Sequence, residues 1–247
     1  MDTVVSSPGP SAVSQASAPA LEMPHVSIDC VLFSVYQQRL QVCLLRPDAV
    51  KHQALPSLLS LTIDVMQDKN IEQSIRRFLC AQYNLELPFL EQVKTLGNYR
   101  RDTRGWSISI VYFALMPYAR LHSLLQAVPA LSCVPVHDIQ ALALDHHAIL
   151  QSAVKRLRNK SYYTSLPIYF LPDEFTLSEM QQVYEVVLAR QLEKKAFRRR
   201  IAEAQLIVPV GRLRHGKNRP AKLYRLKPNL HVHYFDRTMR GGHPLER

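Results

Sequence analysis

The feature that most constrains this 247-residue chain is the uneven distribution of its positive charge. Residues 155–227 hold 17 Lys and Arg against 6 Asp and Glu, a net of +11. Residues 1–154 hold 11 against 12, and residues 228–247 hold 3 against 2. A near-neutral part followed by a strongly basic part is typical of a polyanion-binding module joined to another domain. A solvated basic face would give the same pattern.

Composition excludes several other classes of protein. Hydrophobic residues make up 47% and charged residues 21%, as in ordinary globular proteins. No apolar run approaches the ~20 residues that cross a bilayer, and the N-terminus does not resemble a signal peptide. We therefore expect a cytoplasmic protein without a membrane partner. The four cysteines are scattered and never spaced as Cys-x-x-Cys, which favours reduced thiols over disulfides or a zinc site.

The pattern of apolar residues divides the chain into four parts. Residues 1–24 are rich in Ser, Ala and Pro and are predicted to be a disordered tail. Residues 25–160 form the first domain, and prolines at 167 and 172 favour a boundary near 160–172. A second domain then covers 161–227, and residues 228–247 show no period and are predicted to be a tail.

The first domain is expected to be α/β or α+β. Helical periods occur at 71–85, with Asp68 as a possible N-cap, and at 145–160. The predicted strands cover 26–33, 40–45, 93–96 and 107–115.

The basic segment begins with a capping box, in which Thr176 and Glu179 have the Ser/Thr-x-x-Glu spacing. The helix that follows carries an apolar stripe of Met180, Val183, Tyr184, Val187 and Leu188. A second helix is predicted over 193–204. One side of it is apolar, and the opposite side gathers Lys195, Arg198, Arg199 and Ala202.

Two short strands around a basic loop at 211–221 complete a pattern typical of a winged helix-turn-helix. Its second helix would enter the major groove of duplex DNA, and its wing would follow the phosphate backbone. A single-stranded or ribosomal RNA binder is the alternative, but such modules stack bases on exposed aromatic residues, which this basic face lacks. The predicted DNA-binding residues are Thr176, Ser178, Lys194, Lys195, Arg198, Arg199, Arg214, Lys217, Arg219 and Lys222.

Several segments together resemble the Nudix-related transcriptional regulators. They are residues 97–115, Asp145-His146 with Arg156, Leu157 and Lys160, and residues 175–185, 197–201 and 219–225. The resemblance implies a Nudix-like α/β/α sandwich fused to a C-terminal winged helix, acting as a homodimer on a palindromic operator. Members are bacterial regulators, usually repressors, of NAD cofactor synthesis and related pathways. The best-known members sense ADP-ribose, and one branch responds to sugars.

The chain departs from the Nudix enzymes at the residues that hydrolysis needs. The family's Arg-Glu-x-x-Glu-Glu maps onto residues 77–82, where Phe78, Ala81 and Gln82 replace the glutamates. The preceding Pro-Gly-Gly maps onto Leu59-Ser60-Leu61. None of these replacements offers the anionic oxygens that Mg²⁺ prefers. We therefore predict no catalytic residue, no metal and no cofactor. The alternatives are an active hydrolase using other carboxylates such as Glu72, and a DNA-binding dimer without an effector.

A polar cluster in the first domain offers a place for an effector. Arginine forks suit phosphate groups, and a tryptophan can stack on a base or a sugar. The cluster's residues could instead pair with one another and support a loop. The candidate effector-binding residues are Arg46, Asn98, Arg101, Asp102, Arg104 and Trp106.

Overall fold

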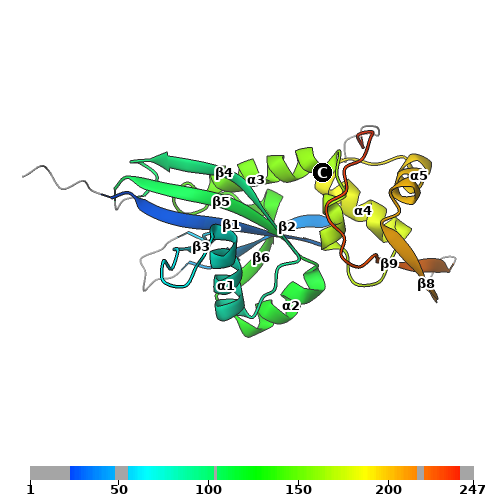
Figure 1. The fold of residues 1–247 in the computed structure, drawn as a ribbon, viewed down its shortest axis with the longest axis horizontal. Helices are drawn as coiled ribbons and strands as arrows, with labels where there is room; N and C mark the ends of the chain where they lie inside the picture. Colours follow the sequence, from blue (N-terminus) through cyan, green and yellow to red (C-terminus); the bar gives the residue numbers. More distant parts are fainter. Residues whose placement is uncertain (1–22, 48–54, 103–104, 216–219, 240–247) are drawn as a thin grey trace, which may run out of the picture.

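A computed structural model describes residues 23–47, 55–102, 105–215 and 220–239. Outside these ranges lie residues 1–22 of the predicted N-terminal tail, the predicted site residues Arg104, Lys217 and Arg219, and residues 240–247. The described chain has two parts, which Figure 1 shows at opposite ends of the long axis: a sheet covered by helices, and a smaller helical part with its own sheet. Within the described residues, no helix is long and apolar enough to cross a membrane.

The larger part is a mixed sheet between helices. Its strands are β1 (His25–Tyr36), β2 (Arg39–Leu45), β3 (Leu59–Leu61), β4 (Phe89–Asn98), β5 (Ser107–Leu115) and β6 (Leu131–Pro135). Its helices are α1 (Ile71–Tyr83), α2 (Tyr118–Ala127), the 3-10 turn η1 (Val136–Asp138) and α3 (His146–Ser161).

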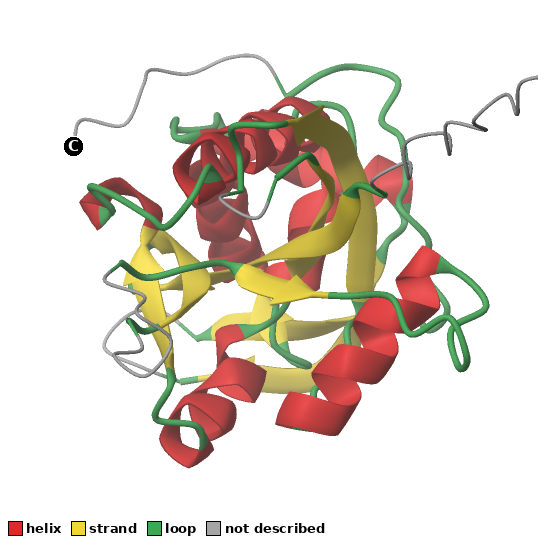
Figure 2. Cartoon of the chain, turned by 90° about the vertical axis from the view of Figure 1, so that its left-hand side faces the viewer, coloured by secondary structure: helices red, strands yellow, loops and turns green. Residues whose placement is uncertain are grey.

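Strand β1 organises this sheet. The order in the described residues is β4-β5-β1-β2-β6, with β3 paired to β1 outside this path. β1 is parallel to β5 and antiparallel to β2 and β3. Because side chains alternate along a strand, Val31 and Phe33 face the cluster under α3, while Cys30 and Leu32 face the cluster under α1 and α2. Figure 2 shows helices on both faces of the strands, as the predicted α/β/α sandwich requires.

The N-cap of helix α1 lies two residues after the proposed Asp68. Asn70 is the N-cap, and its side chain accepts a hydrogen bond from the backbone N–H of Gln73. The prediction of Asp68 as N-cap is wrong because Arg77 holds that carboxylate, with Nε–Oδ1 and Nη2–Oδ2 distances of 2.6 and 2.8 Å. This bidentate pair lowers the pKa of Asp68 well below its usual range.

The smaller part contains the two predicted helices of the basic segment. Its elements are the 3-10 helix η2 (Leu166–Phe170), β7 (Phe175–Thr176), α4 (Leu177–Leu188), α5 (Lys194–Ala204), β8 (Ile207–Arg214) and β9 (Ala221–Leu226). The predicted capping box is present: Thr176 Oγ1 accepts from the N–H of Glu179, and the Glu179 carboxylate accepts from the N–H of Thr176. The three strands form a sheet in the order β7-β9-β8.

The two parts share a continuous apolar core. Leu166, Phe170 and Val187 of the smaller part belong to the same buried cluster as α3 and one face of the large sheet. The ring of Tyr169 also lies 4.8 Å from that of Phe89 on β4. The junction is therefore packed like a protein interior and is not an exposed linker.

The last described residues correct the prediction of a C-terminal tail. Residues 228–239 have no helix or strand period, yet Phe235 and Met239 are buried in the core of the smaller part. The backbone N–H of Phe235 donates to the carbonyl of Tyr163 at 2.8 Å, and the N–H of Ser165 donates to the carbonyl of His233 at 2.8 Å. The segment is held by single buried anchors and backbone bonds to 162–165, which periodicity cannot reveal.

Candidate nucleic-acid interface and effector domain

Helix α5 presents one face to the core and the other to solvent. Phe197 and Ile201 are buried, and the Phe197 ring packs edge-on against Tyr184 of α4 at 5.3 Å. At the start of the helix, Glu193 accepts hydrogen bonds from the N–H groups of Lys195 and Ala196, which lowers the pKa of its carboxyl. The exposed side carries Lys194, Lys195, Arg198 and Arg199, as the sequence predicts.

A concave surface joins this helix to the start of α4 and to the wing. A cavity of about 460 Å³ contains five of the predicted DNA-binding residues. They come from three elements that are distant in the sequence: Thr176 and Ser178 at the start of α4, Lys194 and Arg198 on α5, and Lys222 on β9. Pro220, Ala221 and Tyr224 also line it and were not predicted, because apolar and aromatic residues carry no charge signal.

The wing arginines are already paired in this structure. Arg214 forms an ion pair with Glu179, and Arg212 forms one with Glu174. Arg214 also donates to the carbonyl of Glu174 at 3.2 Å. Glu179 thus serves both the capping box and the wing, so β8 is held against the start of α4. These pairs are exposed, where an ion pair contributes about 0–1 kcal/mol, so a phosphate can displace the carboxylate.

The first domain contains a buried polar cluster around Asp29. Its carboxylate accepts hydrogen bonds from Ser60 and Ser109, and Arg101 Nη2 lies 3.2 Å from Oδ2. Arg101 also contacts Asp145, with Nε–Oδ2 at 3.1 Å and Nη2–Oδ1 at 3.2 Å. The cluster therefore connects β1, β3 and β5 to the start of α3.

His146 completes this cluster through both of its ring nitrogens. Its Nδ1 accepts the backbone N–H of Leu58 at 3.1 Å, and its Nε2 lies 3.6 Å from Asp29 Oδ1. Burial raises the pKa of Asp29, but the hydrogen bond and electrostatic attraction of His146, together with the hydrogen bonds from Ser109 and Ser60, outweigh burial and lower it overall. Asp29 is thus an ionised buried carboxylate with Arg101 as its countercharge.

The predicted effector residues occupy different environments. Arg101 and Asp102 are buried, and Arg101 is engaged by two carboxylates. Asn98 accepts hydrogen bonds from the N–H groups of Arg100 and Arg101 and shapes the loop after β4. Trp106 is half exposed, and its indole packs against Gly97. A side chain at position 97 would place its Cβ only 3.1 Å from the indole ring. Arg46 is exposed at the end of β2.

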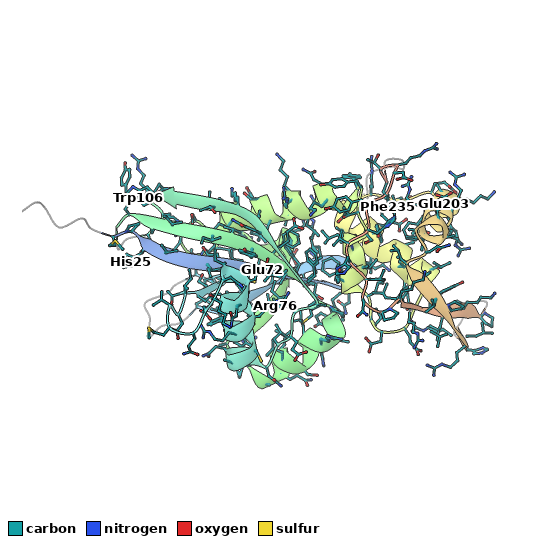
Figure 3. The ribbon with its side chains drawn as sticks, in the orientation of Figure 1. His25, Glu72, Arg76, Trp106, Glu203 and Phe235 are labelled. Carbon is teal, nitrogen blue, oxygen red and sulfur yellow. The ribbon has the colours of Figure 1, made fainter. Side chains whose placement is uncertain are left out.

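A cavity of about 430 Å³ lies beside α1, where the Nudix resemblance places the diphosphate chemistry. It is lined by Ser27, Ser60, Leu61, Thr62, Asp64, Arg77 and Phe78. Phe78 occupies the cavity wall at a position where the Nudix pattern has a glutamate. Glu72, at the first turn of α1 (Figure 3), lines a different cavity with Asn70, Ile71 and Tyr112. In the described ranges, no group of three or more His, Cys, Asp and Glu could hold a metal. The residues present therefore do not fit the Mg²⁺ ions of a Nudix hydrolase.

Comparison with known proteins agrees with both parts of the fold. The model of the NrtR DNA-binding winged helix domain matches residues 167–226. The chain is 38% identical over 204 residues to the ADPR responsive transcriptional repressor NtrR of Acinetobacter baylyi, covering 82% of each protein.

Solved structures extend this likeness to the whole fold. The crystal structure of Shewanella oneidensis NrtR complexed with a 27mer DNA matches with a TM-score of 0.80 and 34% identity, over 87% of this chain and 99% of that one. A MutT/nudix family protein from Enterococcus faecalis matches with a TM-score of 0.64 and 19% identity, over 84% of this chain and 89% of that one. The second match shows a shared fold only.

Proposed function

Because the chain belongs to the NrtR family of Nudix-related transcriptional regulators, we propose that it is a DNA-binding repressor that responds to ADP-ribose. The winged helix would bind an operator, and the Nudix-like part would bind the effector. We further propose that it acts in the bacterial cytoplasm on genes of NAD cofactor synthesis, as a homodimer whose twofold axis matches a palindromic operator.

The observation that carries the DNA-binding proposal is the cavity shared by α4, α5 and β9. It brings Lys194, Arg198 and Lys222 to one concave surface beside the exposed ridge of α5. A helix with an apolar core side and a cationic outer side can enter a major groove while its flanks neutralise phosphates. The helix N-terminus at Thr176 adds backbone N–H groups, which favour an anion. The solved relative in complex with a 27mer DNA supports DNA binding by this fold.

The cavity beside α1 is our proposed effector site. Its volume of about 430 Å³ lies in the usual range for small-molecule pockets. The hydroxyls of Ser27, Ser60 and Thr62 and the carboxylate of Asp64 can hydrogen-bond to ribose hydroxyls. Arg77 pairs with Asp68 through Nε and Nη2 and can offer Nη1 to a diphosphate. Arg46, Asn98 and Trp106 remain proposed effector contacts, whereas the ion pairs of Arg101 favour a structural role for it.

We also propose that the Nudix-like part binds without hydrolysing. Phe78 at the cavity wall and the separate position of Glu72 support this proposal. Incubation of the protein with ADP-ribose and Mg²⁺ should release no AMP or ribose phosphate. Turnover that disappears in the Glu72→Gln variant would contradict it and restore the hydrolase alternative.

One experiment tests the regulatory proposal as a whole. Genomic fragments captured by the full-length protein are sequenced to define an operator, and binding to that duplex is then measured by fluorescence anisotropy with and without ADP-ribose. We expect preference for the operator over scrambled duplex and a weaker affinity when ADP-ribose is present. Equal affinity for the operator and the scrambled duplex would contradict the proposal that the protein is a regulator. An operator affinity unchanged by ADP-ribose would indicate a DNA-binding protein that does not respond to this effector.

The core shared by the two parts gives the effector a physical route to the DNA-binding helix. The Asp29 cluster fixes the start of α3, and α3 packs against α4. We propose that ligand binding beside β3 shifts this cluster and with it α3. Ser60 is the connecting residue because it lines the cavity and donates to Asp29. Ser60→Ala should reduce the effect of ADP-ribose on operator affinity while DNA binding alone is retained.

A further inference from the structure

The cavity between the start of α4, α5 and β9 is called the wing cavity. The chain after β9 returns to the opposite side of α5. Phe235 and Met239 are buried in the core of the smaller part, so the residues between them are held in place. Figure 3 shows the labelled Phe235 close to Glu203 of α5, at the same end of the molecule. This placement brings Asp236 and Arg237, which are both exposed, beside α5, the proposed DNA-recognition helix.

A second cavity, of about 500 Å³, lies between α5 and this segment. It is lined by Ala196, Arg199, Arg200, Glu203, Ala204, His233, Phe235, Asp236 and Arg237. The cations come from α5 and from the C-terminal segment, and the two carboxylates only partly balance them. Glu203 lies 3.9 Å from Arg199, a distance too long for a strong pair.

The environment of Arg200 shows that the cavity holds excess positive charge. Partial burial lowers the pKa of its guanidinium, and the nearby charges of Arg199 and Arg237 lower it further, against the opposing effect of Glu203. Guanidinium groups that repel one another around a hollow are stabilised when an oxyanion enters between them. Planar Arg forks match the oxygens of a phosphate well.

The position of this cavity relative to α5 identifies the source of the phosphate. With a turn of 100° per residue, Lys194 and Arg198 lie on one flank of α5, and Ala196 and Arg200 lie on the other. The wing cavity uses the first flank and the second cavity uses the other. A helix in a major groove has a phosphate backbone on each side. The wing can reach only one of them.

We infer that residues 233–237 form a second phosphate-binding element, which with Arg199 and Arg200 holds the operator backbone on the side of the major groove opposite the wing. This inference rests on the proposed DNA-binding function and deepens it. The recognition helix would thus be clamped between two cationic cavities. Arg237 is the residue that the segment contributes to this contact.

The test uses full-length Arg237→Ala, with Arg120→Ala as a control that removes one exposed cation of the larger part. Affinity for the operator and for scrambled duplex is measured by anisotropy at three salt concentrations. We expect Arg237→Ala to weaken binding about tenfold on both duplexes, the size of one charge-assisted hydrogen bond. The slope of log affinity against log salt should fall by about one, and Arg120→Ala should leave both quantities unchanged.

Other outcomes overturn the inference in distinguishable ways. Unchanged affinity and slope would show that the cavity does not meet DNA. A loss confined to the operator, with an unchanged slope, would indicate a base contact. Normal DNA binding by Arg237→Ala, together with loss of thermal stabilisation by inorganic phosphate, would indicate a free anion. Failure of the wild-type protein to bind any duplex would remove the proposed function itself.

A charge-reversed variant guards against a folding artefact. Arg237→Glu should weaken binding to both duplexes more than Arg237→Ala does, while Arg237→Lys should retain the salt slope. Because Arg237 is exposed, all three variants should melt within a few degrees of the wild type. If Arg237→Lys lost as much DNA affinity as Arg237→Ala, the proposed role of the positive charge at this position would be overturned.

Discussion

The two parts of this molecule use arginine in opposite ways. The side chain of Arg101 in the larger part is 3% exposed and lies between Asp29 and Asp145. The side chain of Arg199 in the smaller part is 72% exposed, and its distance to Glu203 is 3.9 Å. The local balance of charge explains the difference, because residues 1–154 hold nearly equal numbers of both signs and residues 155–227 do not. A buried arginine held by two carboxylates supports the fold, and an exposed arginine with a weak pair is available to a ligand.

The largest effect is expected from Arg101→Ala. Removing this guanidinium leaves Asp29 as a buried carboxylate without its countercharge, so the free energy of unfolding should fall by about 3–5 kcal/mol. Urea denaturation followed by circular dichroism measures this loss. The matched control is Arg100→Ala, an exposed neighbour that lies over the ring of Tyr99 and should change stability by less than about 0.5 kcal/mol. Equal stability of the two variants would break the comparison.

The second prediction concerns the exposed arginines of the recognition helix. Arg198→Ala should leave stability unchanged and reduce operator affinity by about 1–3 kcal/mol if the side chain reads a guanine with both nitrogens. Anisotropy on the operator and on a variant with that guanine replaced measures the effect. If Arg198 meets only a phosphate, the loss will be the same on both duplexes and the salt slope will be shallower. Loss of folding in Arg198→Ala would contradict its assignment as a ligand-facing residue.

The third prediction is a pH dependence that arises from Asp29 in the larger part. The pKa of Asp29 is lower in the folded chain than in the unfolded chain. Its contribution to stability is therefore complete above about pH 3.9 and is lost as the pH falls through the folded-state pKa. In Asp29→Asn, the slope of unfolding free energy against pH below pH 4 should be shallower by up to about 1.4 kcal/mol per pH unit. If the unfolding free energies of the wild type and Asp29→Asn changed with pH at the same slope, Asp29 would not be the source of the pH dependence.

The smallest effect is expected at the start of α4. Thr176→Ala removes the hydroxyl that accepts from the N–H of Glu179, which should cost about 1 kcal/mol of stability. Ser178→Ala, two residues further on and exposed, should cost less than half of that. Thermal melting of both variants measures the difference. A larger loss in the Ser178 variant would mean that the capping box is not what fixes this helix.

The sequence predicted the helices and strands of the smaller part better than those of the larger part. The helices of the basic segment have caps and apolar stripes that are local in the chain, such as Thr176 with Glu179 and Phe197 with Ile201. The larger part depends on pairings across long distances, and β3, α2 and β6 were missed. Each is short, and three-residue β3 is defined only by its pairing with β1.

The fate of Arg101 shows why candidate effector residues are hard to predict. Its partner Asp29 is 72 residues earlier and Asp145 is 44 residues later, so only the folded chain brings them together. Within the described residues, none of the predicted effector residues is among those that line the cavity beside α1, and Ser27, Thr62 and Asp64 carry no local pattern that marks them. Likewise Arg237 stands in a segment without any period, and its position depends on Phe235 and Met239.

The shared core at the junction determines how a signal could travel through this molecule. Val187 of α4 packs into the cluster formed by α3 and the large sheet, so the smaller part cannot swing on a free tether. Close-packed interiors resist gradual deformation and change by switching between distinct packings. A response to a ligand would therefore be a switch between two packings of the core at the junction. Substitutions that create space around Val187 should reduce the energetic difference between these packings, although Val187 contacts neither ligand.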